Sequence, residues 1–188
     1  GSRIPASTDS IKKRLHYLKM NGNSIFKVAV GSMADAVRHL LGAANLEIDR
    51  LKLAILTWGN ASAFDPGLGV FAIKPSGLGY GELSPENMVV VDLEGRVVEG
   101  DLRPSSDTKT HLFLYRAFAE IGGVVHTHSR AATAWAQAKR PLPCLGTTHA
   151  DYFRGEVPCT AVISDSQIQR DYEEETGVQI VEAFAAVD

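Results

Sequence analysis

Two histidines one residue apart give this sequence its strongest indication of chemistry. His126 and His128 follow an apolar pair, Val124 and Val125, in a stretch typical of a β-strand. Residues two apart on a strand share a face, so the two imidazoles are expected side by side. Neutral imidazoles placed in this way can occupy neighbouring positions on one divalent metal ion, at about 2.0–2.1 Å for zinc. The alternative is two polar residues on a solvated strand face.

A metal ion held by two histidines needs a third protein ligand. Asp107, expected at the start of a helix, and His149 are the candidates. Asp151 lies close to His149 and is followed by two aromatic residues, an environment that can tune a carboxylate for general acid/base work. The alternative for Asp151 is a helix cap.

Three short segments rich in small hydrogen-bond donors predict sites for a phosphate-sized anion. Each lies at an expected strand end or helix start, where backbone N–H groups, hydroxyls and one lysine can surround a phosphate. The alternative is that they are ordinary turns, because Gly, Ser, Asn and Pro are turn residues. The segments are Trp58-Gly59-Asn60, Lys74-Pro75-Ser76-Gly77 and Pro104-Ser105-Ser106.

Hydrophobic periodicity predicts the elements that must position these residues. Strands and helices interleave, and the strands on either side of Glu94-Gly95 form an expected hairpin. The helix that follows Ser105-Ser106-Asp107 is expected to bury His111, Leu114, Tyr115, Phe118 and Ile121. We therefore expect an α/β fold in which a mixed sheet is layered with helices. The expected strands are 53–57, 69–74, 88–93, 96–99, 124–128 and 157–163, and the other expected helices are 11–18, 32–44, 131–138 and 178–186.

Composition narrows the class of protein. The 188 residues are 45% hydrophobic and 22% charged, as in a globular domain, and no window is apolar enough for a membrane-spanning helix. A net charge of −3 argues against a general nucleic-acid binder. Two cysteines, Cys144 and Cys159, are too few for a disulfide scaffold. We expect a cytoplasmic protein without nucleic-acid or membrane partners.

From about residue 43 onward, the chain resembles the L-ribulose-5-phosphate 4-epimerases of the class II aldolase/epimerase family. Several motifs recur in the family's order, and Asp107 stands where the aldolases usually have a glutamate, which favours the epimerase branch. The matching segments are Thr57-Trp58-Gly59-Asn60, Ile73-Lys74-Pro75-Ser76-Gly77, Met88-Val89-Val90-Val91, Pro104-Ser105-Ser106-Asp107-Thr108, 122–130, 146–153, Pro158-Cys159-Thr160 and Glu174-Glu175-Thr176-Gly177.

This resemblance implies a fold, a cofactor and a set of roles. The fold would be an α/β/α layered, mostly antiparallel sheet in a cyclic homotetramer, with a divalent metal such as Zn²⁺ or Mn²⁺. Asp107, His126 and His128 match metal-site positions and Asp151 matches a catalytic acid/base, whereas His149 is then a neighbour of the site. The positions that match sugar-phosphate binding are Gly59, Asn60, Ser76, Gly77, Ser105 and Ser106, with Lys74 assisting.

The implied reaction interconverts L-ribulose 5-phosphate and D-xylulose 5-phosphate, a step of carbohydrate metabolism such as arabinose catabolism. A carbon without an acidic hydrogen is inverted by retro-aldol cleavage of the adjacent C–C bond and re-addition to the other face of the aldehyde fragment. The metal, as a Lewis acid, would stabilise the enediolate, and Asp151 would handle a hydroxyl proton. The alternatives are a class II sugar-phosphate aldolase and a catalytically inactive, truncated or chimeric metal- and phosphate-binding fragment.

The chain departs from the family pattern at both ends. The family continues with a third metal histidine and a catalytic tyrosine that reaches a neighbouring subunit, and neither motif is found here, so we expect a domain that lacks the C-terminal elements. At the front, residues from about 18 to 53 resemble a stretch of β-ketoacyl-acyl-carrier-protein synthase III, carried by Met20–Val30. We therefore expect a leader of separate origin over residues 1–42 and the epimerase-like domain over residues 43–188.

Overall fold

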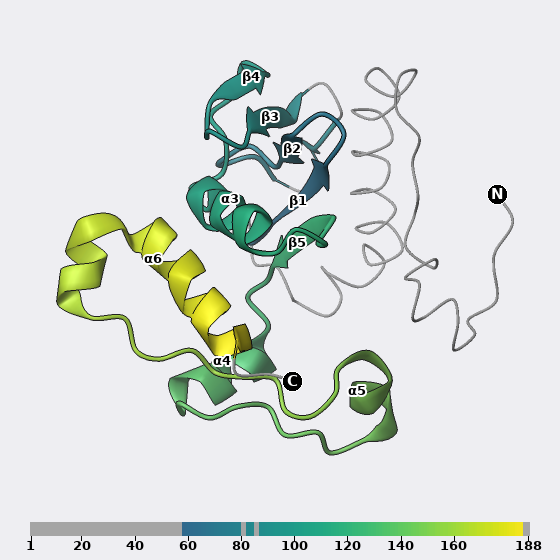
Figure 1. The fold of residues 1–188 in the computed structure, drawn as a ribbon, viewed down its shortest axis with the longest axis vertical. Coiled ribbons are helices and arrows are strands. Elements are labelled where there is room, and N and C mark those ends of the chain that lie inside the picture. Colours follow the sequence, from purple (N-terminus) through teal and green to yellow (C-terminus); the bar gives the residue numbers. More distant parts are fainter. Residues whose placement is uncertain (1–57, 80–81, 85–86, 186–188) are drawn as a thin grey trace, which may run out of the picture.

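A five-stranded sheet forms the centre of the computed structural model, which describes residues 58–79, 82–84 and 87–185 (Figure 1). The strand order is β4-β3-β2-β1-β5, and every pairing between neighbouring strands is antiparallel. The expected antiparallel sheet flanked by helices is confirmed. The strands are β1 (Asn60–Asp65), β2 (Val70–Ile73), β3 (Val89–Asp92), β4 (Val97–Glu99) and β5 (Gly123–His126).

Alternating side chains of two strands make the main core. Phe71 and Ile73 of β2 and Val89 and Val91 of β3 are fully buried on one face of the sheet. Helix α3 (Thr108–Ala117) covers this face and adds Leu112 and Tyr115 to the same cluster. The period of two on the strands thus meets one stripe of the helix, as expected for a helix packed on a sheet.

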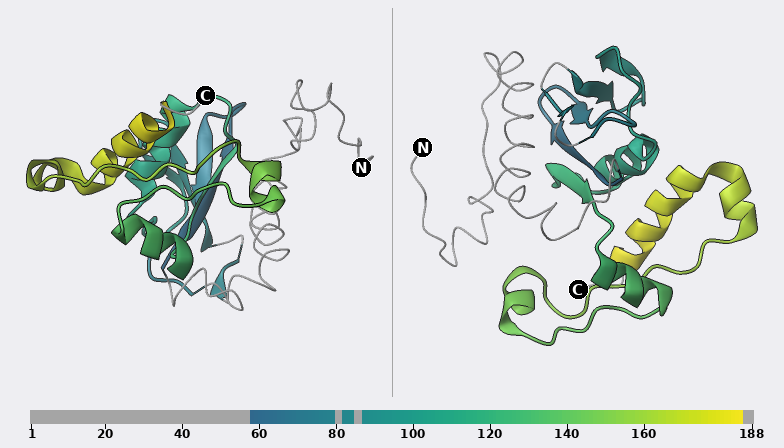
Figure 2. Two further views of the ribbon diagram at one scale, coloured as in Figure 1. Left: turned by 90° about the horizontal axis from the view of Figure 1, so that it is seen from below. Right: turned by 180° about the vertical axis from the view of Figure 1, so that it is seen from behind.

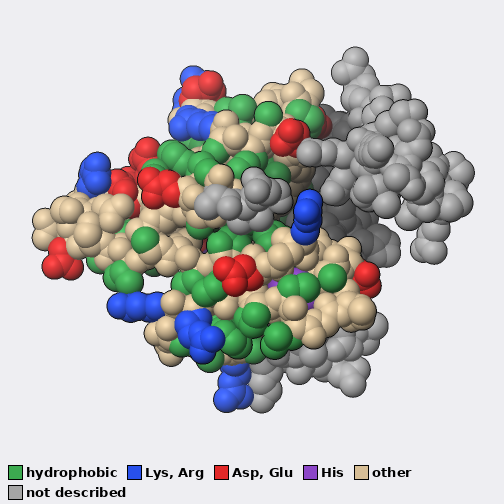
Figure 3. Space-filling view, turned by 60° about the horizontal axis from the view of Figure 1, so that its bottom comes forward, with side chains coloured by type: hydrophobic (Ala, Val, Ile, Leu, Met, Phe, Trp, Pro, Cys, Tyr) green, Lys and Arg blue, Asp and Glu red, His purple; other side chains and the backbone are tan. Residues whose placement is uncertain are grey.

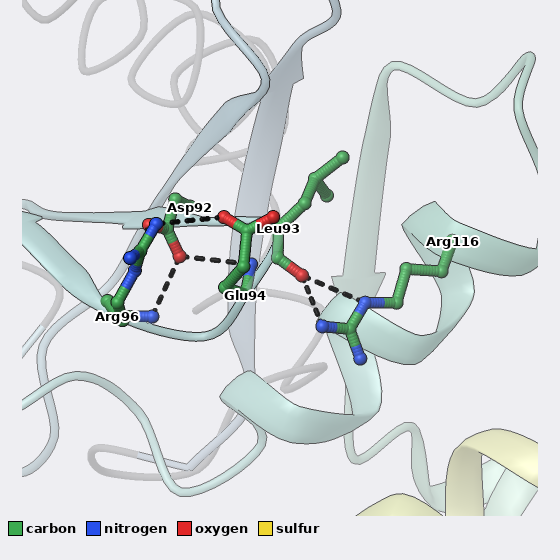
Figure 4. A network of polar contacts seen from close by, with 5 residues as sticks. All are labelled: Asp92, Leu93, Glu94, Arg96 and Arg116. Atoms are coloured by element: carbon green, nitrogen blue, oxygen red, sulfur yellow. Dashed lines mark hydrogen bonds and ion pairs between the residues drawn. The ribbon is translucent and has the colours of Figure 1, made fainter.

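The predicted hairpin is confirmed and has its own polar network (Figure 4). The Asp92 carboxylate accepts the backbone N–H groups of Glu94 and Arg96, at 3.0 and 2.8 Å, and pairs with the Arg96 guanidinium at 2.7 Å. Arg116, in the last turn of α3, donates to the Leu93 carbonyl at 2.9 Å. The Arg116 contact holds the C-terminal end of α3 against the β3–β4 turn.

The long helix α6 (Asp165–Ala185) packs along α3 (Figures 1 and 2). Its backbone is kinked at Asp171, which has non-helical dihedral angles and forms an ion pair with Lys109 of α3. Beyond the kink, Gly177 lies directly against the Phe113 side chain. The sequence predicted only the second part of this helix, because the polar residues from Asp165 to Asp171 carry no apolar period.

Two short helices, α4 (Arg130–Gln137) and α5 (Thr147–Tyr152), lie away from the sheet and contain no buried residue. The strand expected at 157–163 is wrong, since Val157 forms only an isolated bridge with Leu142. Pro158 has no N–H to continue a ladder, and the residues beyond it have no neighbouring strand among the described ones.

The first strand corrects a second prediction. The residues from Trp58 to Asn60 were expected to form a turn, but β1 starts at Asn60 and runs through the middle of the sheet. Its small polar side chains suggested a turn, although Asn60 and Ser62 are buried beneath α3. The strand expected at 53–57, the helices expected at 11–18 and 32–44 and the proposed leader lie outside the described residues.

Within the described ranges, none of the helices combines the length and the apolar character needed to cross a membrane.

Candidate functional site

Asp107 lies where three elements meet. It occupies the N-terminal boundary of α3, its Oδ2 accepts a hydrogen bond from Asn60 Nδ2 of β1 at 2.5 Å, and His126 Nδ1 of β5 lies 2.6 Å away. The hydrogen bond with His126, aided by the one from Asn60, lowers the pKa of Asp107 to about 2 against the effect of partial burial. Asp107 is therefore ionised at neutral pH and holds the His126 ring by one of its two nitrogens.

The two histidines lie side by side, as their spacing predicts. Strand β5 ends at His126, yet the ring centroids of His126 and His128 are only 4.8 Å apart. Trp58 also lies against His128, with ring centroids 5.6 Å apart. Because Asp107 engages Nδ1 of His126, the Nε2 of that ring is the nitrogen available to a metal ion, as in carboxylate–histidine–metal arrangements.

The donor types fit a metal ion, but the set is incomplete. Two imidazole nitrogens and a nearby carboxylate are ligands that zinc accepts. Across residues 58–79, 82–84 and 87–185, no three His, Cys, Asp or Glu side chains converge closely enough to hold one. The described residues thus supply two donors, His126 and His128, with Asp107 placed to orient the first.

Two of the three segments predicted to bind an anion meet at the end of β2. Pro75 pairs with Pro104 in an isolated bridge, the Ser76 N–H donates to the Arg103 carbonyl at 2.9 Å, and the Ser105 N–H donates to the Lys74 carbonyl at 3.1 Å. Ser76 and Gly77 are exposed there, as is Ser106, while Ser105 is half-buried.

The side chains of Lys74 and Asn60, both expected to bind an anion, have hydrogen-bond partners within the protein. Lys74 is only 3% exposed, its Nζ donates to the Pro75 carbonyl at 3.2 Å, and burial lowers its pKa. The Asn60 amide is directed at Asp107, and its Oδ1 is buried without a hydrogen-bond partner in the structure. Gly59, just before it, is buried and has a φ of 79°, a conformation that favours glycine.

The structure does not bring His149 and Asp151 to this cluster. Both lie on α5, where His149 Nε2 bonds the Gly155 carbonyl at 2.8 Å and Asp151 is exposed. Among the described residues, no hydrogen bond or ion pair joins either side chain to Asp107. Asp151 lies inside α5, which is bounded by Gly146 and Phe153, so the alternative role of a helix cap is wrong.

A buried polar network beneath the cluster was missed by sequence reasoning. Ser62 Oγ lies 2.7 Å from His111 Nδ1 and 2.7 Å from the Tyr115 hydroxyl. The periodicity predicted correctly that His111 and Tyr115 are buried, but no local pattern indicates Ser62 of β1 as their partner. The spacing of Asp107, His111 and Tyr115, four residues apart on one helix face, was the signal that could have revealed it.

Known proteins resemble this chain in sequence and in structure. The family described as "Class II Aldolase and Adducin N-terminal domain" matches residues 39–187. L-ribulose-5-phosphate 4-epimerase UlaF from Salmonella paratyphi C is 53% identical over 145 residues, which are 77% of this chain and 64% of that protein. The chain therefore spans less than two thirds of the length of this curated relative.

Solved structures give the same family. An L-fuculose 1-phosphate aldolase aligns with a TM-score of 0.67 and 28% identity, over 81% of this chain and 68% of its own. The L-fuculose-1-phosphate aldolase from Thermus thermophilus aligns with a TM-score of 0.59 and 27% identity, over 73% and 66%. The sheet, the covering helix and the sequence match agree, and this chain belongs to the class II aldolase and adducin N-terminal domain family.

Proposed function

We propose that this chain belongs to a metal-dependent enzyme that epimerises L-ribulose 5-phosphate to D-xylulose 5-phosphate. One observation carries the proposal: in a chain 53% identical to an L-ribulose-5-phosphate 4-epimerase, Asp107 lies against His126, whose ring is beside His128. The cluster is at an edge of the sheet, with side chains partly open to solvent. A small phosphorylated sugar can reach a site of this kind.

In this proposal His126 and His128 hold a divalent metal, with zinc as the first choice and Mn²⁺ as the second. Imidazole nitrogen suits zinc, and the Asp107 carboxylate increases the basicity of His126 while holding its ring. The resemblance implies Asp107 as a third ligand, but its Oδ2 is engaged by His126 Nδ1 and Asn60, so in this proposal Asp107 orients the ring and its ionised state suits that role. The metal, when bound, supplies Lewis-acid stabilisation of the negative charge that C–C cleavage leaves on the substrate.

The phosphate of the sugar is assigned to the loops at the end of β2. Ser76, Gly77 and Ser106 are exposed there, and the two serines offer hydroxyls, because the Ser76 N–H already bonds the Arg103 carbonyl. Lys74 is buried beside them and adds positive charge, while Gly59, with its positive φ, directly precedes β1. Such clusters of small donors favour a phosphate.

Two carboxylates have separate tasks in the reaction. Cleavage of the C–C bond removes the proton of the substrate hydroxyl on the carbon that is inverted, and re-addition to the other face of the aldehyde returns it. Asp107, with its low pKa, binds and orients and does not carry this proton. Asp151 is proposed as the acid/base. Because it lies on α5, apart from Asp107, it would serve this site only after movement or in an oligomer.

A homotetramer, a cytoplasmic location and a place in arabinose catabolism belong to the same proposal. Large apolar side chains are exposed on α5, on α6 and in the segment before α5, with Tyr152 88% and Leu145 85% exposed, and Figure 3 shows apolar side chains at the surface. Apolar surfaces of this kind favour association with other subunits. A phosphorylated sugar substrate points to the cytoplasm.

The second candidate is a class II sugar-phosphate aldolase, which the structural likeness to the L-fuculose 1-phosphate aldolases favours. Both reactions begin with the same bond cleavage, and they differ in whether the fragments are released. The identity to the epimerase is much higher than the identity to the aldolases, so we rank epimerisation first.

Product analysis tests the proposal. The zinc-loaded protein is incubated with L-ribulose 5-phosphate, and the products are separated by chromatography. Formation of D-xylulose 5-phosphate, lost in His128→Ala and kept in His149→Ala, is the expected result. Release of dihydroxyacetone and glycolaldehyde phosphate, the two fragments of C3–C4 cleavage, would support the aldolase. Bound metal without any product would support an inactive fragment, and equal activity in both variants would overturn the site assignment.

A further inference from the structure

The buried network beneath the cluster contains three polar side chains. His111 is 1% exposed, and Ser62 and Tyr115 are each 3% exposed. Ser62 Oγ stands between the other two, 2.7 Å from His111 Nδ1 and 2.7 Å from the Tyr115 hydroxyl. In a site from which water is excluded, losing one member leaves the others without a partner, so the geometry of the group is strongly constrained.

Each member of the network is close to a residue of the cluster, along the same strand or helix or across the sheet. Ser62 is two residues after Asn60 on the same face of β1, and His111 is one turn after Asp107 on α3. On β5, Val124 is opposite Ser62 and two residues before His126. A backbone hydrogen bond involving Val124 also reaches Tyr115. The network therefore joins the three elements that carry Asn60, Asp107 and His126.

Hydrophobic packing alone would leave this junction loosely specified. Helix α3 could slide or rotate by a fraction of a turn over apolar residues such as Leu112, whereas the directional bond from Ser62 to His111 allows one position. The Asp107 side chain must reach two atoms on two different strands, at 2.5 and 2.6 Å. A displacement of α3 of about 1 Å would break one of these contacts.

We propose that His111 is a positioning residue, which through Ser62 fixes α3 so that Asp107 holds the Nδ1 atom of His126. This inference rests on the proposed function only in that His126 is then a metal ligand. His111 is buried and bonded to Ser62, and it is not among the proposed metal or phosphate ligands. Its hydrogen bond supports Asp107, which orients His126, and His126 with His128 presents the metal site.

The test compares two substitutions at one position. His111→Phe fills the space without the hydrogen bond, and His111→Asn keeps a polar atom near the place of Nδ1. Leu114→Ala is the control, because it removes buried apolar contacts from the same helix and leaves the network intact. For each protein we would measure Zn²⁺ affinity by competition with a chromophoric chelator, thermal stability, and the His126 Nδ1–H resonance in protein with ¹⁵N-labelled histidine.

We expect His111→Phe to weaken Zn²⁺ binding by about tenfold or more and to lose the hydrogen-bonded His126 resonance. His111→Asn should restore both to near wild-type values, and Leu114→Ala should lower the melting temperature without changing either. Wild-type affinity and resonance in His111→Phe would overturn the proposal, as would equal losses in Leu114→Ala.

Two further results are decisive. If His111→Phe does not fold, Ser62→Ala breaks the same bond with a smaller change and must give the same two losses. If the wild-type protein binds no Zn²⁺, the proposed function fails, but the His126 resonance still shows whether His111 controls the bond between Asp107 and His126.

Discussion

At the scale of single residues, the central feature is one carboxylate with two partners on different strands. Asp107 accepts a hydrogen bond from the Asn60 amide and forms a second one with His126 Nδ1, and these contacts hold the pKa of Asp107 near 2. An amide donor and an imidazole together leave the carboxylate little freedom to rotate. The role of Asp107 is therefore to be a fixed negative charge beside the histidine pair.

Replacing Asp107 by Asn should weaken Zn²⁺ binding by about 10- to 100-fold, since neutral amides hold and polarise a ligand histidine poorly. Isothermal titration with ZnCl₂ measures the change. Asp165→Asn, in the first turn of α6, removes the same charge far from the histidines and should leave affinity unchanged. Equal affinity of wild-type protein and Asp107→Asn would contradict the assigned role.

His111 makes the stability of the fold dependent on pH. Burial lowers its pKa to about 4 in the folded protein, from an ordinary value of 6.5. The unfolded chain therefore binds a proton first, and the free energy of unfolding should fall as pH drops from about 6.5 to 4. At about 1.4 kcal/mol per pKa unit, the loss is at most about 3 kcal/mol.

Urea unfolding at pH 7 and pH 4.5 checks this expectation. In His111→Asn, which cannot titrate, the free energy of unfolding should fall less between these two values than in the wild type. The Asp107 pKa lies below this interval and contributes little there. An identical pH dependence in both proteins would mean that His111 is accessible to protons in the fold.

At the scale of elements, the sequence predicted strands and helices correctly where the apolar residues follow one clear strand or helix period. Strands β2 to β5 and helix α4 were predicted to within a few residues, because apolar residues follow a strand or helix period. Helix α3 was expected to bury Phe118 and Ile121 as well, but it ends at Ala117, and both residues are half-buried beyond it. Strand β1 was missed because Asn60 and Ser62, two of its three buried residues, are polar. Their burial depends on α3, about 50 residues later in the chain, which no local pattern reveals.

In the candidate site, too, contacts set by local geometry were predictable, and contacts set by the tertiary structure were not. The two-residue spacing of His126 and His128 made their proximity predictable from local geometry, although β5 ends at His126, and the neighbouring loops of Lys74 and Ser105 were named as similar motifs. The bond between Asp107 and His126 joins a helix start to a strand end, so only the tertiary structure shows it. Asp151 was chosen by resemblance, and the fold keeps it apart from Asp107.

Helix α6 packs closely on α3 because residue 177 is a glycine, which has no side chain. A Cβ atom added at Gly177 would lie 2.8 Å from the Phe113 Cβ, which is closer than packed atoms allow. Gly177→Ala should therefore destabilise the protein by about 1–3 kcal/mol, although alanine normally favours a helix. Thermal unfolding of the wild type and the variant measures this loss of stability.

Gly122→Ala is the matched control, because nothing lies within 4 Å of the added atom. It should change stability by less than about 1 kcal/mol. If both variants behaved alike, or if Gly177→Ala were more stable than the wild type, the close packing of α6 on α3 would be wrong.

At the scale of the whole molecule, the sheet region and the α4–α5 region differ in how well they are packed. The sheet and α3 enclose the buried core, whereas α4 and α5 contain no buried residue and lie beside exposed apolar side chains (Figure 3). Subunit association would cover this surface. Light scattering coupled to size-exclusion chromatography should therefore give the mass of four chains, and a monomer at micromolar concentration would contradict the proposed tetramer.

The most direct test of the account is the metal content of the purified protein, measured by elemental analysis after incubation with Zn²⁺ and removal of free ions. The wild type should retain about one Zn²⁺ per chain, and the double variant His126→Ala/His128→Ala should retain almost none, whereas His149→Ala should match the wild type. A wild-type protein without zinc, or a double variant with full zinc content, would show that the histidine pair is not a metal site.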